Sequence, residues 1–217
     1  MNYFAHALPY LDRPYFVAGT AVPDWLSVID RKMRVRSTAA QTLVAHEDPR
    51  IAEVAAGIVQ HHHDDRWFHQ TRTFAELNLQ LTAAVRGVLP DDDSFRPSFL
   101  GHILVEILLD AALIANHRDQ LDAYHEALRS VDPHLVGTGV NQMATRTSDI
   151  WPVFIPHFCA ERFLYDYAED AKLLGRLNRV MRRVHLPPLP DQFQAILPAA
   201  RQAVAQRQQE LLGKRDE

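Results

Sequence analysis

The chain has 217 residues, of which 47% are hydrophobic and 23% are charged, a balance typical of one globular domain. Its 23 basic and 27 acidic residues give a net charge of −4, which argues against nonspecific binding of nucleic acid. The single cysteine, Cys159, excludes an internal disulfide and a cysteine-rich zinc module. We therefore expect a cytoplasmic protein that binds no nucleic acid.

The start of the chain, MNYFAHALPY, places His6 among apolar residues and has neither the basic beginning nor the apolar middle of a secretory signal. We expect it to belong to the mature protein. Glycine is scarce, with 8 residues, and apolar positions recur mostly at three- and four-residue spacing. The sequence therefore predicts an all-α fold, a single-domain helical bundle over residues 1–217.

Predicted helices follow one another along the chain. After Gly19 and Pro23, a helix is expected with Asp24 among its first residues. A long amphipathic stretch runs from about Pro49 to Leu89 and is closed by the loop LPDDDSFRPS, residues 89–98. Further helices are expected over about 98–116, 119–130, 153–183 and 191–212, with GTGVNQ, residues 137–142, as a flexible segment.

The segment over 98–116 is hydrophobic nearly all round, which predicts a central position in the bundle. Its apolar run from Ile103 to Ala115 is interrupted by Glu106 and Asp110. It is also shorter than the roughly 20 residues that cross a bilayer. We therefore expect no membrane span.

Histidine is unusually frequent, with 12 residues, and several lie in the segment AAGIVQHHHDDRWFHQ. Residues four apart share a helix face, so His61, Asp65 and His69 can lie on one side of it. The pair His61 and Asp65 is a possible set of metal ligands. A solvated polar face also explains this segment taken alone.

A second polar stripe lies in GHILVEILLD, where His102, Glu106 and Asp110 recur at four-residue spacing in an otherwise apolar helix. A lone histidine or glutamate there could be a satisfied core group. Burying carboxylates without compensation costs several kcal/mol, so two of them beside a histidine indicate a bound cation.

Imidazole and carboxylate ligands suit Zn²⁺, Mn²⁺ or Fe²⁺, and helical bundles build such sites from facing helices. His6 and Asp24 lie in apolar surroundings and are the natural candidates to complete the set. The predicted ligands of one or two ions are His6, Asp24, His61, Asp65, His102 and Glu106.

The segments MNYFAH, VAGTAVPDW, GIVQHHHDD and LLGRLNRVMRRV resemble the acyl-carrier-protein phosphodiesterase family, whose helical architecture is related to HD-domain phosphohydrolases. The matching positions are His6, Gly19, Asp24, Gly57, His61 and Asp65. The resemblance implies metal-dependent hydrolysis of the phosphodiester that joins phosphopantetheine to a serine of acyl carrier protein. This chain departs from the family in its longer stretch between Asp24 and His61. It also has Gly101-His102, followed by Glu106, where the family has an Asp-His pair.

The order of the predicted ligands is also similar to that of zinc-dependent phospholipase C, another all-helical phosphodiesterase. That family is exported and uses a processed N-terminus among its ligands, and neither feature is visible in this sequence. The similarity supports a metal site more than a lipid substrate.

Both resemblances imply one chemistry, in which a metal-activated water attacks phosphorus. Asp24, His61 and Asp65 are the predicted catalytic residues, with Asp65 bridging ions or orienting the nucleophile. The residues expected to support the ligands are Asp64, His69 and Asp110. Those expected to bind a phosphate or an acidic carrier protein are Arg31, Lys32, Arg34 and Arg36, which could instead form an ordinary solvated loop.

Three functions are compatible with these residues. The first is a phosphodiesterase acting on acyl carrier protein or a small phosphodiester. The second is another metal-dependent phosphoesterase, acting on a phospholipid or nucleotide. The third is a catalytically silent metal-binding protein that uses its helices for protein interaction, and it predicts tight metal binding without turnover.

Overall fold

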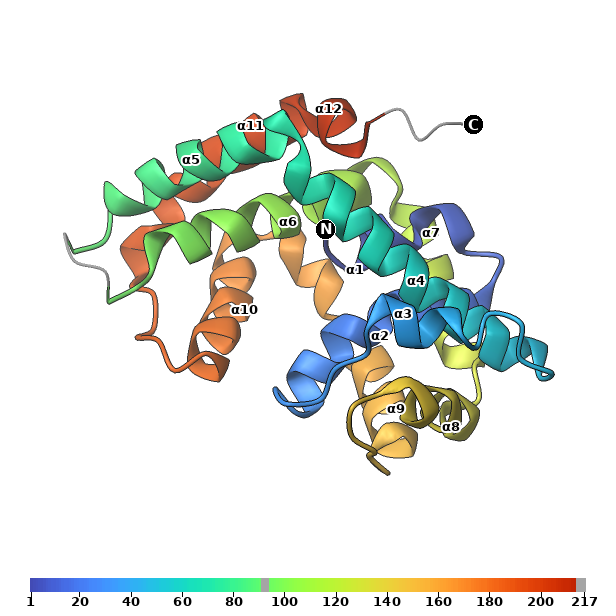
Figure 1. The fold of residues 1–217 in the computed structure, drawn as a ribbon. Helices are drawn as coiled ribbons and strands as arrows, with labels where there is room; N and C mark the ends of the chain where they lie inside the picture. Colours follow the sequence, from blue (N-terminus) through green and yellow to red (C-terminus); the bar gives the residue numbers. More distant parts are fainter. Residues whose placement is uncertain (91–93, 214–217) are drawn as a thin grey trace. The chain divides into compact units, whose positions relative to one another are not determined.

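The computed structural model describes residues 1–90 and 94–213, which contain α-helices, 3-10 helices and an isolated bridge between Val35 and Ala144, and no strand (Figure 1). The predicted all-α fold is confirmed. The predicted loop over 89–98 lies partly outside the described residues, because 91–93 are not among them.

The chain divides into two compact units, each built from separate stretches of sequence. Unit 1 contains Met1–Asn2, Trp67–Asn116 and Phe163–Glu217, and unit 2 contains Tyr3–Arg66 and His117–Arg162. The single domain expected over 1–217 stays a prediction.

Unit 2 is a cluster of helices around large buried side chains such as Phe4, Trp25 and Tyr124. Its helices are α1 (Tyr3–Ala7), η1 (Leu8–Tyr10), α2 (Pro14–Ile29), α3 (Ser37–Gln41), most of α4 (Pro49–Gln70), α7 (Arg118–Ser130), α8 (Pro133–Met143) and α9 (Trp151–Glu161). Helix α2 packs against α1, α7 and α8, and α9 packs against both α7 and α8.

Helix α2 begins at Pro14, ten residues before Asp24. Asp24 therefore lies in the second half of the helix and not among its first residues. Pro14 occupies the first turn, where its missing N–H costs nothing, and Pro23 lies inside the helix. The residues from Phe16 to Val22 are all buried. Burial of this apolar segment outweighs the backbone hydrogen bond that Pro23 removes, so the prediction of a helix start near Asp24 was wrong.

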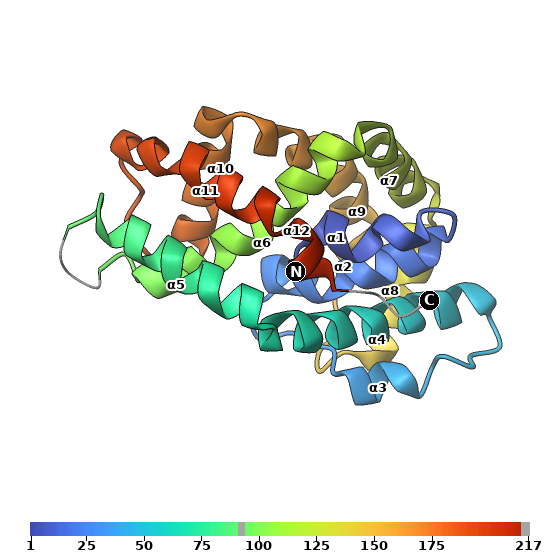
Figure 2. The same cartoon turned by 90° about the horizontal axis from the view of Figure 1, so that it is seen from above.

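Helices α2 and α4 approach each other backbone to backbone at two glycines. A Cβ on Gly19 would lie 2.3 Å from the Val54 carbonyl oxygen, and a Cβ on Gly57 would lie 2.2 Å from the Phe16 carbonyl oxygen. No other residue fits this crossing without moving a helix. Figure 2 shows α1 and α2 beside α4, whose next turn after Gly57 begins the histidine-rich segment.

Unit 1 is arranged around α6 (Pro97–Asn116), which packs against α5 (Arg72–Arg86), α11 (Leu197–Gln206) and η2 (Phe163–Ala168). Figure 1 shows α5 and α11 running alongside α6. The remaining helices are α10 (Asp170–Arg183), η3 (Asp191–Ile196) and α12 (Gln208–Leu212). The predicted central position of this segment therefore holds within unit 1.

Among the described helices, α6 alone is long and apolar enough to cross a membrane, with a mean hydropathy of 1.9 over its best window. Of that window, 61% is buried inside the protein. A buried core helix meets the same criterion as a membrane-spanning helix, so length and hydropathy do not distinguish the two.

The predicted helix over Pro49 to Leu89 is two helices. Helix α4 ends at Gln70, and Thr71 caps α5 by accepting a hydrogen bond from the Phe74 N–H at 3.2 Å. This cap fixes where α5 begins and therefore where Phe74 lies. Periodicity does not report such a break, because the apolar spacing continues through it.

Three further predictions about helix boundaries were wrong. The segment 137–142, expected to be flexible, lies inside α8, where Trp151 occupies the space next to Gly137 that a Cβ would need. The stretch 153–183 is broken at Arg162, which has a φ of 43° and ends α9. The last helix, expected over 191–212, is η3, α11 and α12 in succession.

Candidate metal centre

Within the described residues, two groups of side chains could each hold a metal ion. One consists of His6, His61 and Asp65, all in unit 2, and is called the His6 cluster here. The other consists of His69, His102 and Glu106, all in unit 1, and is called the His69 cluster. In each cluster the ligand atoms lie within 4.8 Å of one another. The structure thus divides the predicted ligands between two places.

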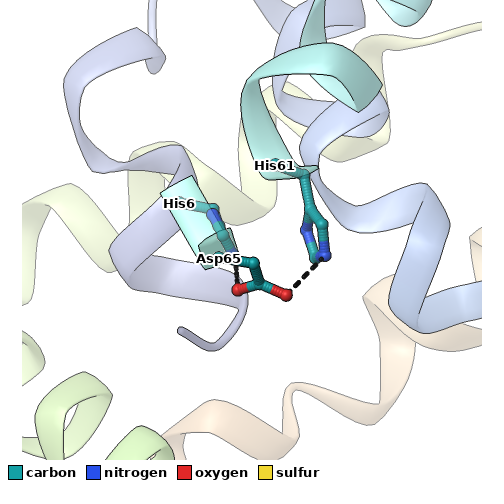
Figure 3. A group of neighbouring side chains, drawn as sticks. All are labelled: His6, His61 and Asp65. Atoms are coloured by element: carbon teal, nitrogen blue, oxygen red, sulfur yellow. Dashed lines mark ion pairs between the residues drawn. The ribbon is translucent and has the colours of Figure 1, made fainter. Parts of the chain in front are cut away.

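In the His6 cluster, α1 supplies one imidazole and α4 supplies the other imidazole and the carboxylate (Figure 3). His6 Nε2 lies 3.3 Å from Asp65 Oδ1, and His61 Nε2 lies 3.4 Å from Asp65 Oδ2. Ligands at about 2.0–2.1 Å from a tetrahedral zinc ion are about 3.3 Å apart. The spacing of these atoms therefore fits a divalent cation.

The orientation of His61 is fixed by α2. Its Nδ1–H donates a hydrogen bond of 2.8 Å to the carbonyl oxygen of Thr20, because a carbonyl can only accept. In the neutral imidazole, Nε2 then carries a lone pair that faces the carboxylate of Asp65. Such a pairing needs a cation between the two groups, either a proton or a metal ion.

His6 lies between two carboxylates. Its Nδ1 is 3.3 Å from Asp64 Oδ2, and Asp64 Oδ1 accepts a hydrogen bond of 2.7 Å from Gln60. The buried His6 Nε2 makes no hydrogen bond with the described part of the chain. A histidine with one ring nitrogen beside a supporting carboxylate and the other directed at a further ligand atom is typical of metal-bound imidazoles.

The charges in the His6 cluster are strongly coupled. Burial would raise the pKa of Asp65, but its contacts with His6 and His61 hold that pKa far below the ordinary 3.8. Burial would lower the pKa of His61, yet Asp65 and the nearby Asp24 raise it above 6.5. The site therefore keeps a carboxylate anion and favours a positive charge beside it.

The His69 cluster joins the last turn of α4 to α6. His69 Nε2 and Glu106 Oε1 are 2.8 Å apart, and His102 Nε2 lies 3.3 Å from the same oxygen. The α-ammonium group of Met1 is 3.4 Å from this oxygen as well. Four-residue spacing on α6 places His102 and Glu106 on one face, as the sequence predicts.

The packing of α6 against α5 explains why a glycine, Gly101, precedes His102. A Cβ on Gly101 would lie 2.3 Å from the Thr82 hydroxyl oxygen and 2.9 Å from the Asn78 carbonyl oxygen, so α5 leaves no room for a side chain. The acyl-carrier-protein phosphodiesterase family, which this chain resembles, has an aspartate at this position, and that side chain would not fit here. The carboxylate that α6 supplies therefore comes from Glu106, one turn after His102.

Glu106 makes the metal-free protein sensitive to acid. Burial would raise its pKa, but the Met1 ammonium group and the two imidazoles lower it from 4.5 to about 2. A carboxyl whose pKa falls on folding stabilises the protein above its unfolded pKa, and that contribution disappears as the pH falls toward the folded pKa. We expect Glu106→Gln to lower the free energy of unfolding at pH 6 by on the order of 3 kcal/mol.

Urea unfolding of the metal-free protein at pH 6, 4 and 3 would measure this effect. The difference between the wild type and Glu106→Gln should shrink as the pH falls from 4.5 toward 2, since both side chains are then neutral. The exposed Glu47 offers a control, and Glu47→Gln should change stability little at any pH. A difference for Glu106→Gln that does not vary with pH would contradict the assignment.

Other predicted site residues lie elsewhere. Asp24 is half-buried on α2 and acts on His61 through its charge, but it is not grouped with the ligand atoms. Asp110 is fully buried on α6 and is likewise outside both clusters. His69, expected to support the ligands, is itself grouped with them. The four-residue spacing of His69 from Asp65 indicated a shared helix face, but only the fold brings His69 next to Glu106.

The basic segment expected to bind substrate lies in unit 2 between α2 and α3. All four of its cationic side chains are exposed: Arg31, Lys32, Arg34 and Arg36. The segment is attached to α4, because His62 Nε2–H donates a hydrogen bond of 2.9 Å to the Val35 carbonyl oxygen. The residue next to His61 thus fixes the backbone that carries these charges.

A comparison with protein-family models, curated proteins and solved structures found no match to this chain. The resemblance to acyl-carrier-protein phosphodiesterases therefore stays a prediction, and so does the relation to HD-domain proteins.

Proposed function

We propose that this protein is a metal-dependent phosphodiesterase whose reaction centre is the His6 cluster. One observation carries the proposal: two buried imidazoles direct Nε2 at one carboxylate, and the Nδ1 atoms of both are held by other groups. Support of this kind on the far side of each imidazole is typical of metal ligands. The histidines of the His69 cluster are more exposed than those of the His6 cluster, so we place the chemistry at the His6 cluster.

The chain's own residues have defined tasks in this proposal. His6, His61 and Asp65 would hold the ion, leaving further coordination positions for water and a phosphoryl oxygen. The lowered pKa of Asp65 keeps its carboxylate anionic at neutral pH. The carboxylate can therefore bind a cation or accept a hydrogen bond from water, but it cannot donate a proton. Asp24 adds negative charge beside His61. A divalent cation, Zn²⁺, Mn²⁺ or Fe²⁺, would polarise the phosphoryl oxygens and lower the pKa of a coordinated water.

The proposed reaction is hydrolysis. A water oxygen forms a bond to phosphorus, the bond from phosphorus to the leaving alcohol oxygen breaks, and the proton lost by water ends on that oxygen. The substrate is proposed as holo acyl carrier protein or a smaller phosphodiester, in a cytoplasmic setting. The exposed basic segment from Arg31 to Arg36 supports an anionic substrate, because it is attached to α4 beside the cluster.

The test is a metal analysis of the purified protein together with hydrolysis of bis-p-nitrophenyl phosphate. We expect bound divalent metal, and turnover that a chelator removes and Mn²⁺ or Zn²⁺ restores. Holo acyl carrier protein would be tested next, with release of phosphopantetheine measured by mass spectrometry. Bound metal without turnover on any phosphodiester would contradict the proposal and favour a binding protein, and turnover that is insensitive to chelators would contradict its metal chemistry.

A further inference from the structure

We infer that the His69 cluster is a second divalent-cation site, with ligands other than those of the His6 cluster, and that it fastens the last turn of α4 to α6. The inference does not depend on hydrolysis. It rests on contacts that all lie within unit 1. The sequence predicts His102 and Glu106 as ligands of the same site as His61 and Asp65, whereas the structure gives them a different third partner, His69.

The first support is the convergence of three ligand atoms. Two Nε2 atoms from different helices approach the same carboxylate oxygen of Glu106, at 2.8 Å and 3.3 Å. These distances are close to the separation of about 3.3 Å between neighbouring ligands of a tetrahedral zinc ion. A single ion among the three atoms would replace these contacts with shorter bonds after a small outward adjustment.

The second support is the packing that holds both imidazoles in place before any ion binds. The Phe74 ring lies edge-on to His69 at 4.8 Å and to His102 at 5.0 Å, measured between ring centroids. Phe74 is buried, and its backbone N–H is bound by the Thr71 cap. The two imidazoles are themselves 4.8 Å apart. Ligands that are fixed in this way lose little side-chain entropy when they bind a metal.

Partial exposure of the ligands predicts the behaviour of the site. The side chains of His69 and His102 are 32% and 39% exposed, and that of Glu106 is 18% exposed, so solvent reaches the ion. Two imidazoles and a carboxylate form a set that Zn²⁺ accepts with water as a fourth ligand. We expect an exchangeable zinc site that is weaker than the buried His6 cluster and that stabilises unit 1 when it is filled.

The test counts zinc ions in the full-length protein by equilibrium dialysis with Zn²⁺, followed by elemental analysis. We expect two ions per chain in the wild type, one in Asp65→Asn, one in His102→Ala and none in the double variant. The exposed His117 gives a matched control, and His117→Ala should still bind two ions. Because His102 is partly exposed, its removal leaves no closed cavity, and far-UV circular dichroism of each variant checks its folding.

A second readout tests the structural role. Zn²⁺ should raise the thermal midpoint of Asp65→Asn, and it should leave that of the double variant Asp65→Asn/His102→Ala unchanged. One ion in the wild type, lost in either single variant, would show a shared site and overturn the inference, and so would one ion lost only in Asp65→Asn. Two ions without turnover on any phosphodiester would overturn the proposed function and leave this inference standing.

Discussion

Replacing Asp65 by asparagine is expected to reduce metal-dependent phosphodiester hydrolysis by on the order of 10³-fold or more. The carboxylate lies within 3.4 Å of both imidazoles of the His6 cluster, so its loss removes the anionic ligand that the two histidines share. Groups that only support a metal ligand typically contribute about 10- to 100-fold, and a ligand should therefore contribute more. The measurement is kcat/KM for bis-p-nitrophenyl phosphate at saturating Mn²⁺ or Zn²⁺.

Two other variants on α4 serve as comparisons for Asp65→Asn. Asp64→Asn removes the carboxylate behind His6 and should cost an intermediate factor, about 10- to 100-fold. His63 is 74% exposed and belongs to neither cluster, so His63→Ala should retain full activity. All three proteins should keep the helical content of the wild type by circular dichroism. A fully active Asp65→Asn protein would exclude the His6 cluster as the reaction centre.

The second large effect is expected at the crossing of α2 and α4. A methyl group at position 57 would meet the Phe16 carbonyl oxygen at 2.2 Å and the Gly19 Cα at 2.9 Å, and both are backbone atoms that cannot rotate away. Gly57→Ala should therefore lower the free energy of unfolding by roughly 3 kcal/mol or more, at the upper end for an overpacked core. For a chain of this length, that corresponds to a fall in thermal midpoint of about 6–12 °C.

The same substitution on an open helix surface supplies the control. Gly175 lies on α10, with no atom within 4 Å of the position of an added Cβ. Gly175→Ala should raise stability by up to about 1 kcal/mol, because alanine favours the helix. Gly57→Ala should also weaken metal binding, since displacement of α2 moves the Thr20 carbonyl that orients His61. Equal stability of the two variants would show that the helices do not meet as described.

Apolar spacing was sufficient to predict the helical content of the chain and the extent of α6, because both depend on which residues recur on one face. It did not predict where helices break. The break at Thr71 depends on a hydroxyl that caps α5, and the continuity of α8 depends on Trp151 packing against Gly137. Both are side-chain contacts that no periodicity contains.

Among the candidate ligands, too, some could be predicted from spacing and others only from the fold. The pair His61 and Asp65 and the pair His102 and Glu106 each lie one turn apart on a helix, so spacing alone identifies them. Which further residue joins each pair is a matter of tertiary structure. His6 comes from α1 and His69 from the last turn of α4, and neither partnership follows from local sequence.

The interleaving of the two units has a consequence for synthesis of the chain. Neither unit is a continuous stretch: Trp67–Asn116 separates the two parts of unit 2, and the two parts of unit 2 separate the three parts of unit 1. As translation proceeds, unit 2 can reach its final contacts only after Arg162 has left the ribosome. Until then, the surface of α2 that packs against α7 and α8 stays uncovered. Contacts between segments that are far apart in the sequence slow folding, and they give chaperones a long interval in which to act.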